Sequence, residues 1–305
     1  MKILIVGGTG MIGGCAAVHL REQGNEVVLA ARRPAAAGTP MATFDTLLGD
    51  YTEGGFSETQ LSPFDAVVFA AGNDIRHLPR GADAAQFWDL TQINGVPAFV
   101  ELARRAGVKR LVHIGSYYHQ VQPDLIETNP YVRGRHLADV KARALATPDF
   151  NVSTLNPPSI VGVIPGQVSK RYETLLAWAR GQRPDVPLFA PPGGTNYMSM
   201  RSLAEAIWGA LQRAESGRAY LVGDENLSYR QYFQMLFDAV GNPQQVEERD
   251  AEHPLLTDAY IVQGRGNHLA YEPEPAETAL LGYRRHDVRR AISEVVAYVE
   301  ATEST

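Results

Sequence analysis

The chain has little cysteine, no long apolar run and no excess of basic charge. Its 305 residues include one cysteine, Cys15, so a disulfide within the chain is excluded. No run of about 18 apolar residues occurs, and the first apolar segment is too short for a signal peptide. The chain has 34 Asp and Glu against 28 Lys and Arg. Proteins that coat nucleic acids are normally basic instead. We expect a cytoplasmic protein without membrane or nucleic-acid partners.

Short apolar segments alternate with helical stretches through residue 160. This order predicts an α/β fold in which a parallel sheet is covered on both faces. Asn94 and Pro97 interrupt the longest helical stretch, and we expect the proline to bend its axis. The expected strands are 2–6, 26–31, a weak one near 43–48, 66–70, 110–114 and 151–155. The expected helices are 11–23, 56–61, 83–106 and 131–146.

Beyond residue 160 the pattern changes to segments punctuated by proline and glycine. We expect helices near 168–181, 202–214, 228–240 and 287–301, and a strand over 218–222 that returns to the main sheet. The predicted division is a core of residues 1–160, rejoined by segments such as 195–225, and a smaller substrate-binding lid in residues 161–305.

A glycine-rich turn follows the first strand directly. In Gly7-Gly8-Thr9-Gly10-Met11-Ile12-Gly13 three glycines are spaced three apart, and an amphipathic helix follows. Glycine permits a sharp turn, close approach to a pyrophosphate and tight packing of helix on strand. The helix N-terminus then offers free N–H groups to the anion. The turn predicts a dinucleotide site that includes Gly7, Gly10, Met11, Ile12 and Gly13.

The ends of the next strands suggest which dinucleotide binds. Strand 26–31 is followed by Arg32 and Arg33, with no carboxylate to hold a ribose 2′-hydroxyl, so NADP is favoured and NAD is the alternative. The alternative reading is a pair of solvated arginines. Asp50 follows the third strand and is a candidate for the adenine amino group, or an ordinary loop aspartate. Ala70-Ala71-Gly72 would let the chain approach the cofactor ribose.

The order of these motifs resembles the extended or atypical short-chain dehydrogenases/reductases, the NAD-dependent epimerase/dehydratase family. The resemblance covers nearly the whole chain. It implies a Rossmann-type doubly wound parallel sheet with a smaller C-terminal substrate-binding lid. It adds Asn94 and Pro157 to the expected cofactor site. Its markers are the glycine turn, Asp50, Ala70-Ala71-Gly72, Asn94, Ser116, Pro130-Tyr131 and the segment Leu155-Asn156-Pro157-Pro158-Ser159-Ile160-Val161-Gly162.

The resemblance also implies a catalytic set in which this chain departs from the family. Tyr131 is the expected acid or base, and Ser116 is expected to hydrogen-bond the reacting oxygen. The lysine usual four residues after the tyrosine is replaced by Arg135. Arginine on the same helix face supplies positive charge but does not relay a proton as lysine does. Either Arg135 substitutes electrostatically, or the site has moved or lost its redox step.

Other candidates are weaker. Lys141 lies nearly three helical turns after Tyr131 and is expected at the surface. Tyr117, Tyr118 and His119 wall the cleft or take part in catalysis. No metal site is expected from the scattered histidines. Basic residues at helix starts, Lys170, Arg171 and Arg201, are candidates for a phosphate or carboxylate or are merely solvated.

Two functions remain open at this point. The first is an NAD(P)-dependent oxidoreductase or nucleotide-sugar epimerase/dehydratase, with hydride transfer and a tyrosine acid/base. The second is a non-catalytic dinucleotide-binding regulator or scaffold, which the missing lysine favours. The expected partner is a small-molecule substrate. A homodimer through helices 83–106 and 131–146 is a further expectation from the resemblance.

Overall fold

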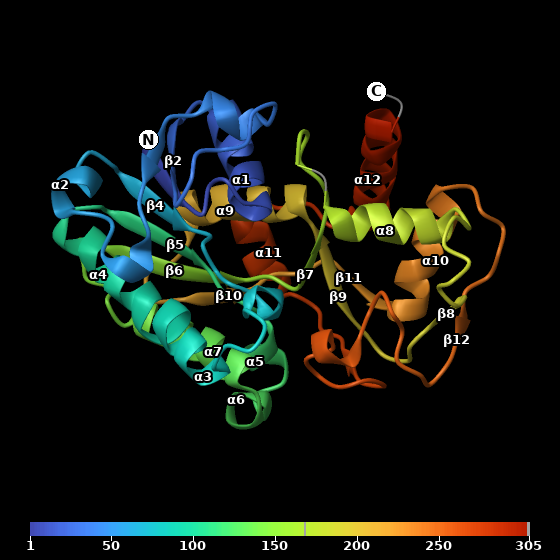
Figure 1. Cartoon of the computed structure of the whole chain (residues 1–305). Coiled ribbons are helices and arrows are strands. Elements are labelled where there is room, and N and C mark those ends of the chain that lie inside the picture. The colour runs from blue at the N-terminus through green and yellow to red at the C-terminus, as the bar shows by residue number, and fades with distance from the viewer. Residues whose placement is uncertain (168, 304–305) are drawn as a thin grey trace.

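A seven-stranded parallel sheet forms the larger part of the molecule (Figure 1). The computed structural model describes residues 1–167 and 169–303. The strand order is β10-β6-β5-β4-β1-β2-β3, so the chain runs outward from β1 in both directions, as in a doubly wound sheet. The predicted α/β Rossmann-type fold is confirmed. The strands are β1 (Lys2–Val6), β2 (Glu26–Ala31), β3 (Thr46–Leu48), β4 (Ala66–Phe69), β5 (Arg110–Ile114), β6 (Asn151–Asn156) and β10 (Ala219–Leu221).

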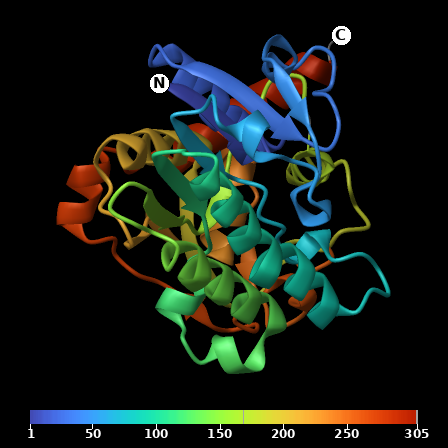
Figure 2. The same ribbon diagram turned by 90° about the vertical axis from the view of Figure 1, so that its left-hand side faces the viewer.

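Alternate residues of the strands feed two separate cores. Ile3 and Ile5 pack with the helices α1 (Met11–Glu22) and α9 (Met200–Arg213). Leu4 and Val6 pack on the other face with α4 (Gly95–Arg105) and α7 (Pro130–Arg143). Burial on both faces explains why these strands read as continuous apolar runs. Figure 2 shows the helices of the second face side by side in front of the sheet.

The third strand is shorter than the weak one expected near 43–48. Residues Pro40–Thr43 form a 3₁₀ helix, η1, with Pro40 in its first turn, and β3 begins only at Thr46. A proline has no N–H to give to a sheet but fits the start of a helix. The expectation was therefore wrong for its first residues.

The long helix of residues 83–106 is broken at the expected place, but by a different device. It consists of α3 (Ala84–Trp88), a π-helical segment η4 (Asp89–Asn94) and α4, which begins at Gly95. Pro97 lies in the first turn of α4, which continues directly from η4, and it has no N–H to give to the Ile93 carbonyl four residues earlier. The wide π turn interrupts the α-helical path, and the proline lies directly after it.

Residues after β6 build a second, smaller unit. Strand β9 (Gly194–Ser199) lies between β11 (Glu225–Ser228) and β13 (His268–Leu269), and β7 (Ser159–Val161) also pairs with it. Helices α8 (Lys170–Ala179), α10 (Tyr229–Ala239) and α12 (Val288–Glu303) pack into one core here (Figure 1). Residue 168, where the first of these helices was expected to begin, lies outside the described residues.

The C-terminal half also contributes to the main sheet. β10 pairs with β6 in parallel, and α9 packs against α1. The remaining segments are short. No helix within the described residues is long and apolar enough to cross a membrane. The short elements are α2 (Glu58–Leu61), α5 (Tyr118–Val121), α6 (Leu125–Thr128), α11 (Pro275–Leu281), β8 (Phe189–Ala190), β12 (Glu247–Glu248), and the 3₁₀ helices η2 (Tyr51–Glu53), η3 (Ile75–His77) and η5 (Asp258–Tyr260).

Candidate functional site

The glycine turn between β1 and α1 leaves no room for a side chain at Gly7 or Gly13. A Cβ on Gly7, whose φ is +80°, would lie 2.8 Å from the Ala71 nitrogen. A Cβ on Gly13 would overlap the Gly7 carbonyl oxygen. Gly10 caps α1 with extended backbone and no side-chain hydrogen bond, so the first N–H groups of the helix, at Met11, Ile12 and Gly13, are available to an anion. The turn fits a dinucleotide pyrophosphate.

Ala70, Ala71 and Gly72 continue the floor of this region from the end of β4. The Ala70 N–H donates to the Val6 carbonyl at 2.8 Å, which holds the segment against β1. A Cβ on Gly72 would overlap the guanidinium of Arg135 and lie 3.1 Å from its Cζ. The small residue at position 72 therefore makes room for Arg135 of α7.

The sequence-predicted adenosine residues meet at the end of β2. The Arg32 Nη1 lies 3.9 Å from Asp50 Oδ2, and the arginine side chain is 77% exposed. Asp50 also caps η2 by accepting the Thr52 N–H at 2.9 Å. Arg33 is exposed beside Arg32. A carboxylate that holds one of the two arginines weakens the positive field that a 2′-phosphate would meet.

Ser116, Tyr131 and Arg135 lie together at the carboxyl end of the sheet, where ligands of doubly wound folds bind. Asn129 caps α7 by accepting the Tyr131 N–H at 3.0 Å, and Arg135 follows one turn later on the same face. All three side chains are buried, with residue exposures of 5% for Ser116, 7% for Tyr131 and 5% for Arg135.

Arg135 binds the backbone that carries Ser116. Its Nη2 donates to the Ile114 carbonyl at 2.9 Å and also to the Gly115 carbonyl, and its Nη1 lies 3.4 Å from the Gln92 side-chain oxygen. A single lysine nitrogen does not offer this planar fork of donors. Arg135 therefore fixes the end of β5 while it places positive charge close to Tyr131.

Opposing effects act on the Tyr131 phenol. Burial raises its pKa above the ordinary value and dominates. The charge of Arg135 lowers the pKa, Asp74 raises it, and hydrogen bonding with Ser116 and the charge of Arg76 lower it. The phenol is thus neutral at pH 7, as a proton donor requires, and the cations and Ser116 favour the phenolate that a base requires.

Asn94 does not join this group. It is exposed, and its amide donates to Asp89 Oδ2 at 2.9 Å. The π turn places Gln92 inward instead, fully buried, where its amide donates to the Asn73 carbonyl at 3.4 Å. The expectation of Asn94 at the cofactor is not supported by this orientation. The extra residue in a π turn shifts which side chain faces inward, and sequence periodicity carries no signal for it.

Asn156 is a site residue that the sequence reasoning passed over. Its side-chain oxygen accepts the Ser116 N–H at 2.9 Å, and its amide donates to Gln120 Oε1 at 2.7 Å. A Cβ on Gly115 would overlap that oxygen. Pro157, the neighbour that was named, is buried at the turn between β6 and β7. Asn156 belongs to the motif quoted above, so the signal was present.

A buried ionic pair lies behind Asn156. His119 Nε2 is 3.1 Å from Asp139 Oδ2, and Arg143 Nε is 2.6 Å from Asp139 Oδ1. Burial alone would raise the pKa of Asp139, but hydrogen bonds from His119 and Arg143 outweigh it and hold the pKa well below its ordinary value. His119 is therefore part of a structural network beside the site.

Two other candidates are engaged elsewhere. The Tyr117 hydroxyl is 2.6 Å from Thr195 Oγ1, which ties the β5 end to β9. Arg201 forms an ion pair with Asp287. Asp224, Glu225 and His286 lie close enough together to hold a metal ion. However, the Asp224 carboxylate accepts the backbone N–H groups of residues 286 and 287, which explains its position without a metal.

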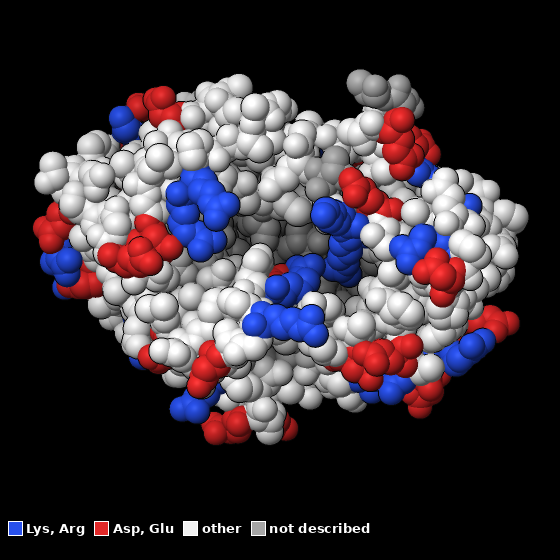
Figure 3. All heavy atoms as spheres, viewed as in Figure 1, with Lys and Arg blue, Asp and Glu red and all other residues white. Residues whose placement is uncertain are grey.

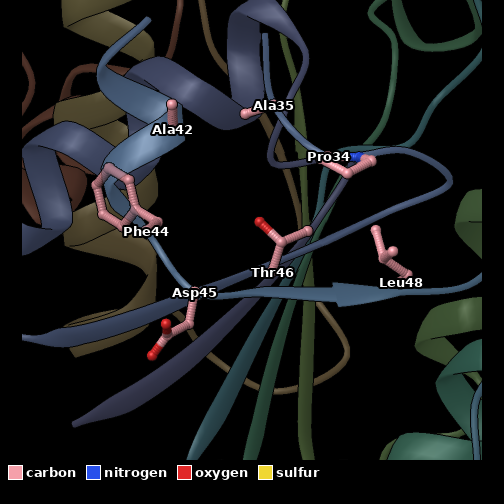
Figure 4. A pocket seen from close by; sticks show the side chains of 7 residues that line it. All are labelled: Pro34, Ala35, Ala42, Phe44, Asp45, Thr46 and Leu48. Carbon is pink, nitrogen blue, oxygen red and sulfur yellow. The ribbon is translucent and has the colours of Figure 1, made fainter. Parts of the chain in front are cut away.

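An open pocket of about 300 Å³ adjoins the segment after Arg33. Its walls come from that segment, from η1 and from β3. Figure 4 shows Thr46 pointing into the space and Asp45 pointing away from it. A second pocket lies over α3 and the start of α7. Ser116, Tyr131 and Arg135 line neither pocket. The first is lined by Pro34, Ala35, Ala42, Phe44, Asp45, Thr46 and Leu48.

Known proteins with similar sequences or structures include several sugar-nucleotide epimerases. A UDP-glucose 4-epimerase of Streptomyces lividans is 28% identical over 318 residues, covering 92% of this chain and 94% of that protein. A solved UDP-glucose 4-epimerase of Thermotoga maritima with UDP-glucose has a TM-score of 0.75 at 15% identity, covering 99% and 100% of the chains.

A third similar protein was solved with NAD. It is a UDP-glucuronic acid 4-epimerase of Bacillus cereus, with a TM-score of 0.71 at 13% identity, covering 99% of both chains. The expected preference for NADP finds no support in these comparisons. Residues 3–223 match the model of the NAD dependent epimerase/dehydratase family, and the chain belongs to this family.

Proposed function

We propose that this protein is an NAD-dependent epimerase of a nucleotide-linked sugar. The observation that carries the proposal is the convergence of Ser116, Tyr131 and Arg135 at the sheet edge that also holds the glycine turn. The 28% identity to a UDP-glucose 4-epimerase over almost the whole chain supports it.

Each catalytic residue has a distinct role in the proposal. The bound dinucleotide supplies a hydride acceptor, so that a substrate carbinol is oxidised and the resulting carbonyl is reduced on its other face. Tyr131 accepts the hydroxyl proton during oxidation and returns it during reduction. Ser116 hydrogen-bonds the reacting oxygen, and Arg135 stabilises the Tyr131 phenolate electrostatically.

The glycine turn and the β4 end hold the dinucleotide in this scheme. Gly7, Gly10 and Gly13 admit the pyrophosphate, and Ala70, Ala71 and Gly72 border the ribose. Arg32 and Arg33 favoured NADP on the sequence alone, but the Asp50 carboxylate 3.9 Å from Arg32 opposes a 2′-phosphate. We therefore expect NAD to bind at least as tightly as NADP, and calorimetric titration with both decides the point.

Two further expectations join this proposal. Residues 161–305 act mainly as a substrate lid over the core of residues 1–160, which segments such as 195–225 rejoin. A homodimer forms through the helical stretch of residues 83–106, which comprises α3, η4 and α4, and through residues 131–146, most of which belong to α7. The exposure of Leu90 (51%) and Val140 (40%) near these helices supports such an interface, and light scattering on the purified protein tests it.

The decisive experiment measures turnover. Purified protein is supplied with NAD⁺ and UDP-glucose, and UDP-galactose formation is followed by nuclear magnetic resonance. We expect turnover in the wild type and its loss in Tyr131→Phe, with dinucleotide binding retained. Tyr260→Phe, which alters an exposed tyrosine, is the matched control and should match the wild type.

A second candidate function is favoured by Arg135 itself. If the wild type binds dinucleotide but epimerises neither UDP-glucose nor other UDP-hexoses, the protein is a non-catalytic dinucleotide-binding regulator or scaffold. The variant Arg135→Lys distinguishes the non-catalytic protein from the epimerase further. If the wild type is inactive and this variant turns over substrate, the arginine has removed the redox step.

A further inference from the structure

The side chain of Tyr51 connects separate parts of the candidate site. Tyr51 begins η2, directly after Asp50. Its hydroxyl donates to the Thr91 carbonyl at 2.8 Å and lies 3.4 Å from the Ala71 carbonyl oxygen. Its ring packs edge-on against Phe69 of β4, with 5.1 Å between the ring centroids. The hydroxyl therefore reaches both the end of β4 and the π turn η4, and no role described so far uses it.

Tyr51 and the π turn are in close contact. A Cβ on Gly95, the residue that follows the turn, would lie 3.0 Å from a ring carbon of Tyr51. A larger residue at position 95 would therefore push the ring and the turn apart. The π conformation is rare in helices, because it departs from their regular hydrogen-bond pattern. A donor from outside the helix, such as the Tyr51 hydroxyl on the Thr91 carbonyl, helps to hold it.

The π turn directs Gln92 toward Arg135. Gln92 follows Thr91 in the chain and is fully buried, and its Oε1 lies 3.4 Å from Arg135 Nη1. Because the pair is buried, a guanidinium that lost this acceptor would have no water to replace it. Arg135 and Tyr131 are four residues apart on α7 and share one face of the helix. A chain of contacts therefore runs from the Tyr51 hydroxyl through Gln92 to Arg135.

This chain of contacts is uncharged up to Arg135 and lies inside the molecule. Thr91 and Gln92 are 7% and 0% exposed, and burial raises the pKa of Tyr51 above its ordinary value, so its phenol is neutral at pH 7. Charged groups gather elsewhere: Figure 3 shows a hollow at the centre of one face, bordered on both sides by Lys and Arg side chains. A substitution at Tyr51 therefore alters geometry and leaves the charge around the hollow unchanged.

We propose that Tyr51 is a positioning residue for the epimerase reaction. Its hydroxyl holds the π turn, and the turn keeps Gln92 against the Arg135 cation beside the tyrosine that moves the proton. This inference rests on the proposed function, because the rate of that reaction reports the position of the cation. A cation that is free to move away stabilises the Tyr131 phenolate less.

The test compares Tyr51→Phe, which removes only the hydroxyl, with the wild type in the UDP-glucose assay. We expect kcat to fall at least about fivefold, while KM and the affinity for NAD stay within about twofold. The rise of the oxidation rate with pH should occur at higher pH, because Arg135 is held less firmly. Tyr283→Phe, which removes a buried hydroxyl that donates to the Gly223 carbonyl at 3.3 Å, is the matched control and should match the wild type.

A second variant tests the route through Gln92. Gln92→Met keeps a side chain of similar length but removes its hydrogen bonds, so kcat should fall and the pH profile should shift in the same direction. If Tyr51 acts through Gln92, the double variant should be no more than about twofold slower than Gln92→Met alone. Thermal unfolding of each variant sets an assay temperature at which all of them are folded.

Three results would overturn the inference alone. Unchanged kcat and pH profile in Tyr51→Phe would show that the hydroxyl positions nothing. A loss of NAD affinity larger than the loss of kcat would assign the hydroxyl to the dinucleotide floor at Ala71. Losses that multiply in the double variant would show that Tyr51 and Gln92 act independently. A wild type that binds NAD without turnover would instead refute the proposed function, and the inference with it.

Discussion

Two adjacent glycines of α1 allow a sharp test of the dinucleotide site. A Cβ on Gly13 would overlap the Gly7 oxygen and lie 2.9 Å from the Gly7 carbonyl carbon and 3.0 Å from Gly8 Cα. All of these atoms are backbone of the turn itself. A Cβ on Gly14 would instead meet the Met41 sulfur at 2.8 Å and Ile164 Cδ1 at 3.0 Å, which are ends of side chains that can move.

The two substitutions therefore have different expected costs. Gly13→Ala forces the turn apart, and such overpacking should lower the free energy of unfolding by about 1–3 kcal/mol. Gly14→Ala gains about 1 kcal/mol of helix propensity, which offsets the shift of Met41, so its stability should stay within about 1 kcal/mol of the wild type. Because the displaced turn of Gly13→Ala carries the proposed pyrophosphate site, NAD affinity should fall at least about tenfold, or 1.4 kcal/mol.

Thermal unfolding and calorimetric titration with NAD measure both effects. The comparison holds helix, residue type and burial constant, since both glycines are buried in α1. The reasoning fails if Gly13→Ala binds NAD as tightly as Gly14→Ala. It also fails if both variants lose affinity equally, because the close approach at residue 13 would then have no special role.

Three further predictions concern the proposed catalytic residues and the ionic network beside them. Arg135→Met removes the cation that lowers the pKa of Tyr131. In a plot of the oxidation rate against pH, the rise in rate should therefore occur at higher pH than in the wild type. Arg135→Lys keeps a positive charge and should shift this rise less. Asn156→Ala leaves the buried Ser116 N–H without its acceptor, at about 1–3 kcal/mol, and kcat should fall more than KM changes. The lowered pKa of Asp139 contributes stability that is present above about pH 4 and lost as pH falls below it. Asp139→Asn should lower stability at pH 7 by about 3–5 kcal/mol and flatten this acid dependence in urea unfolding.

The sequence predicted the main sheet well because both faces of the strands are buried. The strands β1, β2, β4 and β5 are rich in apolar residues, and β6 carries Val152 and Leu155 among polar ones; each of the five matches the prediction within one residue. Strand β9 was missed because its sequence, Gly194-Thr195-Asn196-Tyr197-Met198-Ser199, is largely polar. All six residues are nevertheless buried. Hydrogen bonds from distant segments, such as that between Asn196 and Asn226 at 2.8 Å, satisfy the polar groups, and no local pattern records them.

The residues of the candidate site also differ in how well the sequence could predict them. The glycine turn and the pair Tyr131 and Arg135 are set by local spacing, so the sequence could place them on one turn and one helix face. Gln92 and Asn156 reach the site through contacts between residues 43 and 40 positions apart, with Arg135 and Ser116 respectively. Such partners depend on how β5, β6 and η4 pack, which spacing along the chain does not encode.

Position 135 carries an arginine where the family usually has a lysine, and this arginine is part of the packing of the site. The guanidinium occupies the space where a side chain at Gly72 would lie, and it donates to the two carbonyls that end β5. A shorter lysine would leave one of these carbonyls without a donor, at about 1–3 kcal/mol. Arg135→Lys should therefore destabilise the protein while it retains positive charge near Tyr131. A variant that loses stability but keeps its pH profile of turnover would separate the structural role of Arg135 from its electrostatic one. An unchanged stability would mean that the carbonyl contacts contribute little, and the charge alone would then account for an arginine at this position.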